Sequence, residues 1–180
     1  MMNRKEFLKG AAGTMAMAAL CGAGLNDKAA AAEGTLEEKV QYLLDREAIA
    51  ECQYRYARGC DMKDTDLLAS AFDETITVYY PLVDLKLENT SGKDMAQGIV
   101  GSFVKDGITT QHYMNVYEIR IDGDTASGIT YLRATHKKED SDFWIHGGYY
   151  DNTYVRTENG WRIKSVALYG MYDEGVPYTG

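Results

Sequence analysis

The chain has 180 residues, which corresponds to one domain, with or without a processing segment. Hydrophobic residues make up 45% of it and charged residues 26%, so a disordered or collagen-like chain is excluded. The formal net charge of -8 argues against nucleic acid as a partner, because binding to phosphates needs a cationic surface. The 14 tyrosines combine apolar rings with hydroxyl groups, which favours a pocket for a small hydrophobic molecule.

Residues 1–32 have the pattern of an export signal. A basic start precedes a short apolar run and then four alanines at 29–32. The segment resembles a twin-arginine signal in which Lys5 replaces the second arginine, while Cys21 leaves lipid attachment open as an alternative. We therefore expect an exported protein, in the periplasm or otherwise outside the cytoplasm, whose single mature domain is 33–180.

A long helix is predicted at the start of the mature domain. Thr35 and Glu38 form a capping box, in which each side chain accepts a hydrogen bond from the main chain of the other residue. Apolar residues then recur at helical spacing and predict a helix that ends near Gly59. Cys52 and Cys60 lie about 12 Å apart on this helix, too far for a disulfide, which needs less than about 7 Å.

Shorter elements are predicted next. Asp64 or Thr65 can cap a second helix, and Ser91 a third. β-branched and aromatic residues before Pro81 predict a strand, with a hairpin partner after it. The expected ranges are 66–72 for the second helix, 75–80 and 84–89 for the hairpin, and 91–105 for the third helix.

Long β-favouring runs fill the rest of the chain. They are separated by turn signals, among them Asp-Gly at 122–123 and Asn-Gly at 159–160. The expected strands are 108–122, 125–137, 143–156 and 161–169. Helices followed by such strands predict an α+β fold, in which a curved, mixed or antiparallel sheet wraps around about three N-terminal helices.

The candidate chemistry depends on three histidines and one aspartate. His112, His136 and His146 fall in predicted strands and lack the spacing of a metal site, so we expect no metal. Asp61 follows the long helix, where a carboxylate could orient an imidazole from the sheet and stabilise its cation. A solvated loop residue or a helix cap is the alternative for Asp61, and a structural or surface position is expected for His146.

A resemblance to a known family is carried by four segments. These are 57–66 (ARGCDMKDTD), Tyr80, 110–113 (TQHY) and 132–136 (LRATH). They resemble the scytalone dehydratases, of the SnoaL-like group in the nuclear transport factor two-like superfamily, over about residues 36–172. The resemblance implies a cone-shaped α+β barrel with an enclosed pocket, which works without a cofactor. It also implies a homo-oligomer, a trimer or a dimer.

The resemblance further implies catalytic roles. Asp61 would orient His112, which would remove the proton alpha to a carbonyl group and could protonate the leaving hydroxyl. His136 would hold the substrate or assist the departure of hydroxide. Tyr80 would donate, directly or through a water molecule, to the carbonyl oxygen while enolate charge develops there.

Two departures from the family pattern concern the substrate. The scytalone dehydratases have a second tyrosine directly before the aspartate, where this chain has Cys60, a poor donor. Tyr56, one helical turn earlier, is the candidate replacement. Tyr56 with Asp61 also resembles the bile-acid dehydratases, but Gly170 stands near the position of an arginine of that group, so a bile-acid substrate is not supported.

Candidate substrate-binding residues complete the predicted site: Cys60, Tyr131, Tyr150 and Asn152. By strand alternation, about half of the strand tyrosines face a pocket. The tyrosines in question are Tyr113, Tyr117, Tyr131, Tyr149, Tyr150, Tyr154 and Tyr169.

The leading hypothesis is a cofactor-independent dehydratase that eliminates water from a small, hydrophobic hydroxy-carbonyl compound, which we expect to be cyclic. A ketosteroid-type isomerase is an alternative, because moving a double bond uses the same enolate. A non-catalytic, exported protein that binds a hydrophobic ligand is the other alternative.

Overall fold

The structure, a computed structural model, describes residues 34–81 and 84–175, except for the side chain of Tyr117. The predicted export signal, with Cys21, lies outside the described residues. The described chain has an α+β fold, with elements in the order α3, α4, β1, β2, α5, β3, β4, β5 and β6. No helix in these ranges is long and apolar enough to cross a membrane.

Helix α3 (Leu36–Met62) begins at the predicted capping box. The Thr35 main-chain N–H donates to Glu38 Oε2 at 2.7 Å, and the Glu38 N–H donates to Thr35 Oγ1 at 3.3 Å. Further along the helix, Ile49 and Tyr56 belong to its buried stripe and pack into the hydrophobic core. The capping box therefore identified the start of this helix. The apolar periodicity identified its buried side only from Ile49 onward, because Val40, Leu43 and Leu44 in the earlier turns are exposed.

The end of α3 differs from the prediction, because the helix continues past Gly59 for almost another turn. Lys63 adopts a left-handed conformation (φ 56°), and the Asp64 N–H donates to the Gly59 carbonyl at 2.9 Å, which closes the helix. Helix α4 (Thr65–Ala69) follows at once, with Asp64 as its N-cap. A Cβ at Gly59 would lie 2.6 Å from Leu68 Cβ, so the glycine lets α4 pack directly on the end of α3.

A hairpin and a further helix come next, as predicted. Strand β1 (Phe72–Tyr80) pairs antiparallel with β2 (Leu85–Ser91). Helix α5 (Gly92–Ser102) is capped by Ser91, whose hydroxyl accepts the Asp94 N–H at 3.3 Å.

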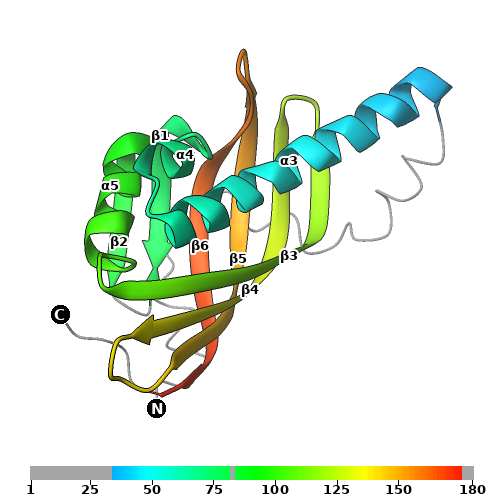
Figure 1. Cartoon of the computed structure of the whole chain (residues 1–180). Helices are drawn as coiled ribbons and strands as arrows, with labels where there is room; N and C mark the ends of the chain where they lie inside the picture. The colour runs from blue at the N-terminus through cyan, green and yellow to red at the C-terminus, as the bar shows by residue number, and fades with distance from the viewer. Residues whose placement is uncertain (1–33, 82–83, 176–180) are drawn as a thin grey trace, which may run out of the picture. The chain divides into compact units, whose positions relative to one another are not determined.

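Four long strands complete the sheet. They are β3 (Ile108–Asp122), β4 (Thr125–Lys138), β5 (Trp144–Thr157) and β6 (Gly160–Glu174). The strand order is β2-β1-β6-β5-β4-β3, with β1 and β6 parallel and the other neighbours antiparallel. This mixed sheet is curved, as predicted, but open, since β2 and β3 form its edges (Figure 1). Strand β6 continues past the predicted end at 169, and this extension contributes to the site described below.

One face of the sheet, here called the inner face, packs against α3 and α5. Side chains alternate along β4, so that Thr130, Leu132, Ala134 and His136 are buried while Tyr131, between them, is exposed. The core combines inner-face residues of this kind with the buried stripe of α3. Strand alternation therefore decides which side chains reach the interior.

A buried carboxylate, that of Asp45, joins α3 to β5 and β6. The Asp45 carboxylate accepts bonds from Arg156 Nη1 at 2.6 Å, Arg156 Nη2 at 2.8 Å and Trp161 Nε1 at 3.0 Å. Chiefly through the Arg156 hydrogen bonds, the pKa of Asp45 falls to about 2. The carboxylate is therefore charged throughout the physiological range and fully hydrogen-bonded.

Candidate active site

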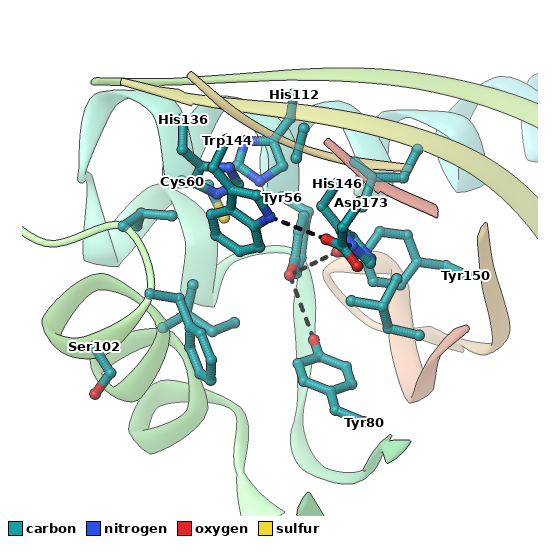
Figure 2. A pocket seen from close by; sticks show the side chains of 16 residues that line it. Tyr56, Cys60, Tyr80, Ser102, His112, His136, Trp144, His146, Tyr150 and Asp173 are labelled. Atoms are coloured by element: carbon teal, nitrogen blue, oxygen red, sulfur yellow. Dashed lines mark hydrogen bonds and ion pairs between the residues drawn. The ribbon is translucent and has the colours of Figure 1, made fainter. Parts of the chain in front are cut away.

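A cavity of about 400 Å³ lies between the inner face of the sheet and the helices α3 and α5 (Figure 2). This volume is within the range of small-molecule sites. Much of its wall is apolar: Ile99, Phe103, Val104, Leu132, Ala134 and Leu168. The polar groups in it belong mainly to three tyrosines, three histidines and an aspartate, which are described in turn below.

The first polar group is His112 on β3, which is paired with Asp61 in the last turn of α3; Asp61 itself is not one of the described residues that line the cavity. His112 Nδ1 lies 2.6 Å from Asp61 Oδ1, and the His112 main-chain N–H donates to Oδ2 at 3.0 Å. The Thr110 hydroxyl also donates to Oδ1 at 3.0 Å. Because a carboxylate only accepts, the neutral His112 ring carries its proton on Nδ1 and a lone pair on Nε2. The expected contact between Asp61 and His112 is therefore present.

The Asp61 carboxylate is stabilised in its charged form. Burial raises its pKa, but hydrogen bonds from the His112 ring and main chain and from the Thr110 hydroxyl outweigh burial, so the net pKa is lowered. The negative end of the α3 dipole opposes the charge as well. An ionised Asp61 can thus stabilise a positive charge that arises on His112.

The second histidine, His136 on β4, lies beside His112 and under Trp144. Its ring centroid is 6.0 Å from that of His112 and 4.2 Å from that of Trp144, on which it stacks at 23°. Burial, together with the neighbouring His112, lowers the pKa of His136 to about 4. At neutral pH this imidazole is uncharged and can both donate and accept a hydrogen bond.

Three buried phenols form the next group. Tyr56 on α3 lies between Tyr80 on β1 and Tyr150 on β5, with hydroxyl distances of 3.4 Å and 3.1 Å (Figure 2). Burial raises the pKa of all three well above its usual value, so each remains a protonated donor at neutral pH. Such a cluster can donate to an oxygen atom that gains negative charge.

A second imidazole–carboxylate pair lines the same cavity. His146 Nδ1 on β5 lies 3.0 Å from Asp173 Oδ1 on β6, and Trp144 Nε1 donates to the same oxygen at 3.0 Å. Burial raises the pKa of Asp173, but the hydrogen bonds from His146 and Trp144 outweigh it and the net pKa is lowered. His146 is only 5% exposed, so a surface position for it is wrong.

Two of the four predicted substrate-binding residues line the cavity, and two do not. Cys60 and Tyr150 line the cavity, and burial raises the pKa of the Cys60 thiol, which is therefore uncharged. Asn152 is 1% exposed and on the inner face, but it is not one of the described residues that line the cavity. Tyr131 does not line this cavity: it is 44% exposed, because its neighbour Leu132 occupies the inward position on β4.

Alternation sorts the other strand tyrosines in the same way. Tyr154 is buried on the inner face and accepts a bond from Gln53 Nε2 at 2.8 Å. A row of tyrosine rings lies on the opposite face of the sheet: Tyr79, Tyr169, Tyr149 and Tyr131. These outer rings do not reach the cavity.

Three residues of the site are missing from the prediction: Trp144, His146 and Asp173. The two β5 residues have the same parity as Tyr150, so strand alternation could have identified them as inward-facing. Asp173 lies beyond the predicted end of its strand, and a register shift beside Gly148 interrupts the alternation before it. A Cβ at Gly148 would come within 2.3 Å of a main-chain oxygen of β6, so this irregularity requires glycine.

Within 34–81 and 84–175, no three His, Cys, Asp or Glu side chains converge in a metal-binding arrangement. Cys52 and Cys60 are both buried and free, as their helical spacing predicts.

Known proteins share this architecture. The crystal structure of the Kfla4162 protein from Kribbella flavida is 29% identical, with a TM-score of 0.68 over 74% of this chain and 95% of that chain. A proposed scytalone dehydratase from Novosphingobium aromaticivorans is 22% identical, with a TM-score of 0.63 over 79% and 93%. The hexachlorocyclohexane dehydrochlorinase LinA-type3 from Novosphingobium barchaimii is 17% identical, with a TM-score of 0.64 over 79% and 99%.

The last two similarities concern the fold, and the names of both proteins describe enzymes of the lyase type. The family assignment comes from the sequence itself, because the SnoaL-like domain family matches residues 41–167. This range extends from the first turns of α3 into β6 and includes both imidazole–carboxylate pairs except Asp173. The chain therefore belongs to the SnoaL-like family, within the nuclear transport factor two-like superfamily.

Proposed function

We propose that this chain is a cofactor-independent dehydratase that eliminates water from a small, hydrophobic, cyclic hydroxy-carbonyl compound. The observation that carries the proposal is the 2.6 Å contact between Asp61 and His112, whose ring lines a cavity that also holds three phenols. Elimination through an enolate needs a base for a carbon-bound proton and donors for the carbonyl oxygen. His112, held by Asp61, supplies the base, and the three phenols supply the donors.

His112 acts as the base. Its Nε2 takes the proton from the carbon next to the carbonyl group, and the electrons of the broken C–H bond form the enolate. Asp61 holds the proton on Nδ1 and stabilises the imidazolium that results. The main-chain bond from His112 to the same carboxylate keeps the two groups in register during this transfer.

The phenols stabilise the enolate oxygen. Tyr56, Tyr80 and Tyr150 keep their protons because burial raises their pKa values, so they donate rather than compete as anions. Donors fixed before the reaction in a water-poor cavity stabilise developing charge without reorganisation. Removal of one such donor in other enzymes costs about 10²–10³ in kcat.

The second half of the reaction releases water. The enolate re-forms the carbonyl group and expels the hydroxyl from the adjacent carbon, while the His112 imidazolium returns its proton to the leaving oxygen. The products are one water molecule and an α,β-unsaturated carbonyl compound, and His112 is neutral again. His136 is uncharged at neutral pH and donates a hydrogen bond that positions the leaving hydroxyl.

The size and polarity of the cavity support a ring compound as substrate. A volume of about 400 Å³ holds a molecule of one or a few fused rings, and the aliphatic wall formed by Ile99, Val104 and Leu168 suits a hydrocarbon frame. The carbonyl end is expected at the phenols and the hydroxyl end at the two imidazoles of His112 and His136.

The test is incubation of the full chain with a panel of cyclic β-hydroxyketones, followed by mass spectrometry of the products. We expect a product that is lighter by one water molecule. His112→Ala should lower kcat by about 10²–10⁴, the usual contribution of one positioned acid–base group. Gln111→Ala is the matched control, because this neighbouring side chain is exposed on the other face of β3 and should retain wild-type turnover.

The outcomes separate the alternatives. A product of unchanged mass would identify an isomerase, and bound but unaltered ligand would identify a binding protein. Wild-type turnover by a folded His112→Ala variant would show that His112 is not the base, and the proposed mechanism would then be wrong.

A further inference from the structure

The pair formed by His146 and Asp173 has no role in the elimination described above, although it lines the same cavity. His146 is 5% exposed, and its Nδ1 is held by Asp173 Oδ1 at 3.0 Å. Its Nε2 is buried and has no hydrogen-bond partner among the residues that the structure describes. A buried polar atom of this kind is costly unless something bonds to it.

The proton positions follow from the acceptor. Asp173 Oδ1 lies within hydrogen-bond distance of both His146 Nδ1 and Trp144 Nε1, and a carboxylate can only accept hydrogen bonds. The neutral His146 ring therefore carries its proton on Nδ1, which leaves a lone pair on Nε2. Hydrogen bonds that lower the pKa of Asp173 keep the carboxylate charged and maintain this arrangement.

The neighbours of His146 on the sheet are mostly small. Its cross-strand partner on β4 is Ala134, and the next inward position on β5 is Gly148, which has no side chain. Leu168 on β6, which also lines the cavity, offers no donor. A ligand in the cavity would thus meet His146 beside small or aliphatic side chains and the Trp144 ring, whose centroid lies 6.3 Å from that of His146.

We propose that His146 Nε2 is a hydrogen-bond-accepting subsite for an O–H or N–H group on the ligand, separate from the groups that react. This inference refines the proposed function, because the substrate would then carry a donor, such as a further hydroxyl, beyond its carbonyl group and its leaving hydroxyl. An acceptor built into the wall penalises an analogue that lacks the donor, since the acceptor then remains unpaired. His146 is accordingly a specificity-determining residue, and Asp173 is the positioning residue that fixes its proton.

The experiment uses beta-naphthol and its methyl ether, which have the same ring system and differ in the donor. Isothermal titration calorimetry of the full chain should give an affinity for the naphthol that is about 10-fold higher than for the ether. His146→Phe should abolish this preference, whereas the matched variant His112→Phe should retain it. Asp173→Asn should weaken the preference, because an amide can donate to Nδ1 and move the ring proton to Nε2.

A second measurement uses the wild-type chain and does not depend on the folding of a variant. The chain has three histidines, so nitrogen NMR of the imidazoles gives three ring systems that single variants assign. We expect His146 Nε2 to have the shift of an unprotonated nitrogen and to move when naphthol is added, but not when the ether is added.

A protonated Nε2 on neutral His146, an unchanged shift with bound naphthol, or equal binding of the two probes to the wild type would each overturn the proposal. If the preference for naphthol over the ether were lost in His112→Phe and kept in His146→Phe, the naphthol hydroxyl would bind at His112. That result would also overturn the proposal. Both readouts are binding measurements without turnover, so they stand or fall separately from the dehydratase assay.

Discussion

Two imidazole–carboxylate pairs, which are constructed differently, each place a histidine in the wall of the cavity. His112 and Asp61 are 51 residues apart and join a strand to a helix end, whereas His146 and Asp173 are 27 residues apart on neighbouring strands. Asp61 accepts a main-chain bond from its own histidine. Among the residues that the structure describes, Asp173 accepts bonds from side chains alone, and it is more exposed, at 42% against 24%. The first pair is therefore held by the backbone and suited to proton transfer, and the second is better suited to ligand selection.

The largest expected effect comes from Asp61→Asn. The amide N–H₂ can donate to His112 Nδ1, which moves the ring proton to Nε2 and removes the lone pair that acts as base. We expect kcat to fall by about 10²–10⁴ with little change in thermal stability. Steady-state kinetics with the substrate found in the ketone panel would measure this loss.

The matched change in the second pair is Asp173→Asn. Here we expect an increase in KM and a kcat within roughly tenfold of the wild type, because the altered hydrogen bond concerns ligand binding. If Asp173→Asn lowered kcat as much as Asp61→Asn does, the functional distinction between the two pairs would disappear.

The same contrast shows what the sequence could predict. The order of helices and strands followed from periodicity, caps and turn residues, and the contact between Asp61 and His112 followed from a family resemblance. Asp173 could not be found in this way, because its side chain meets His146 only after an irregularity in the β5–β6 register. His146 itself was within reach of strand alternation, as its shared parity with Tyr150 shows.

A smaller loss is expected when the phenol cluster is changed. Tyr56→Phe removes the hydroxyl that lies between Tyr80 and Tyr150, and should lower kcat by about 10²–10³ while KM changes little. Tyr154→Phe is the control, since it removes a buried phenol that does not line the cavity and whose partner is Gln53. It should cost about 1 kcal/mol of stability and leave kcat unchanged, so equal kinetic effects would argue against a special role of the Tyr56 hydroxyl.

A third carboxylate, outside the cavity, is expected to act on stability alone. Asp45→Ala leaves the Arg156 guanidinium and the Trp161 indole N–H without their buried acceptor, and should lower the free energy of unfolding by about 3 kcal/mol. Asp124→Ala removes the 79% exposed partner of the same arginine and should cost less than about 1 kcal/mol. Urea unfolding at neutral pH measures both, and similar losses would mean that burial does not decide the strength of these pairs.

The smallest expected effect is the pH dependence that His136 gives to stability. Its pKa is about 4 in the folded chain and about 6.5 when unfolded, so between these values the unfolded state binds more protons. Stability must therefore fall as the pH decreases from about 6.5 to 4. The lowered pKa values of Asp61 and Asp173 act mainly below this window, because the stability that these carboxylates contribute is lost only as the pH falls below their pKa values in the unfolded chain.

His136→Gln should thus flatten the dependence of Tm on pH between 7 and 5, by a few degrees relative to the wild type. An unchanged slope would mean that His136 is protonated in the folded chain, and it could then serve as an acid beside His112 rather than as a neutral donor.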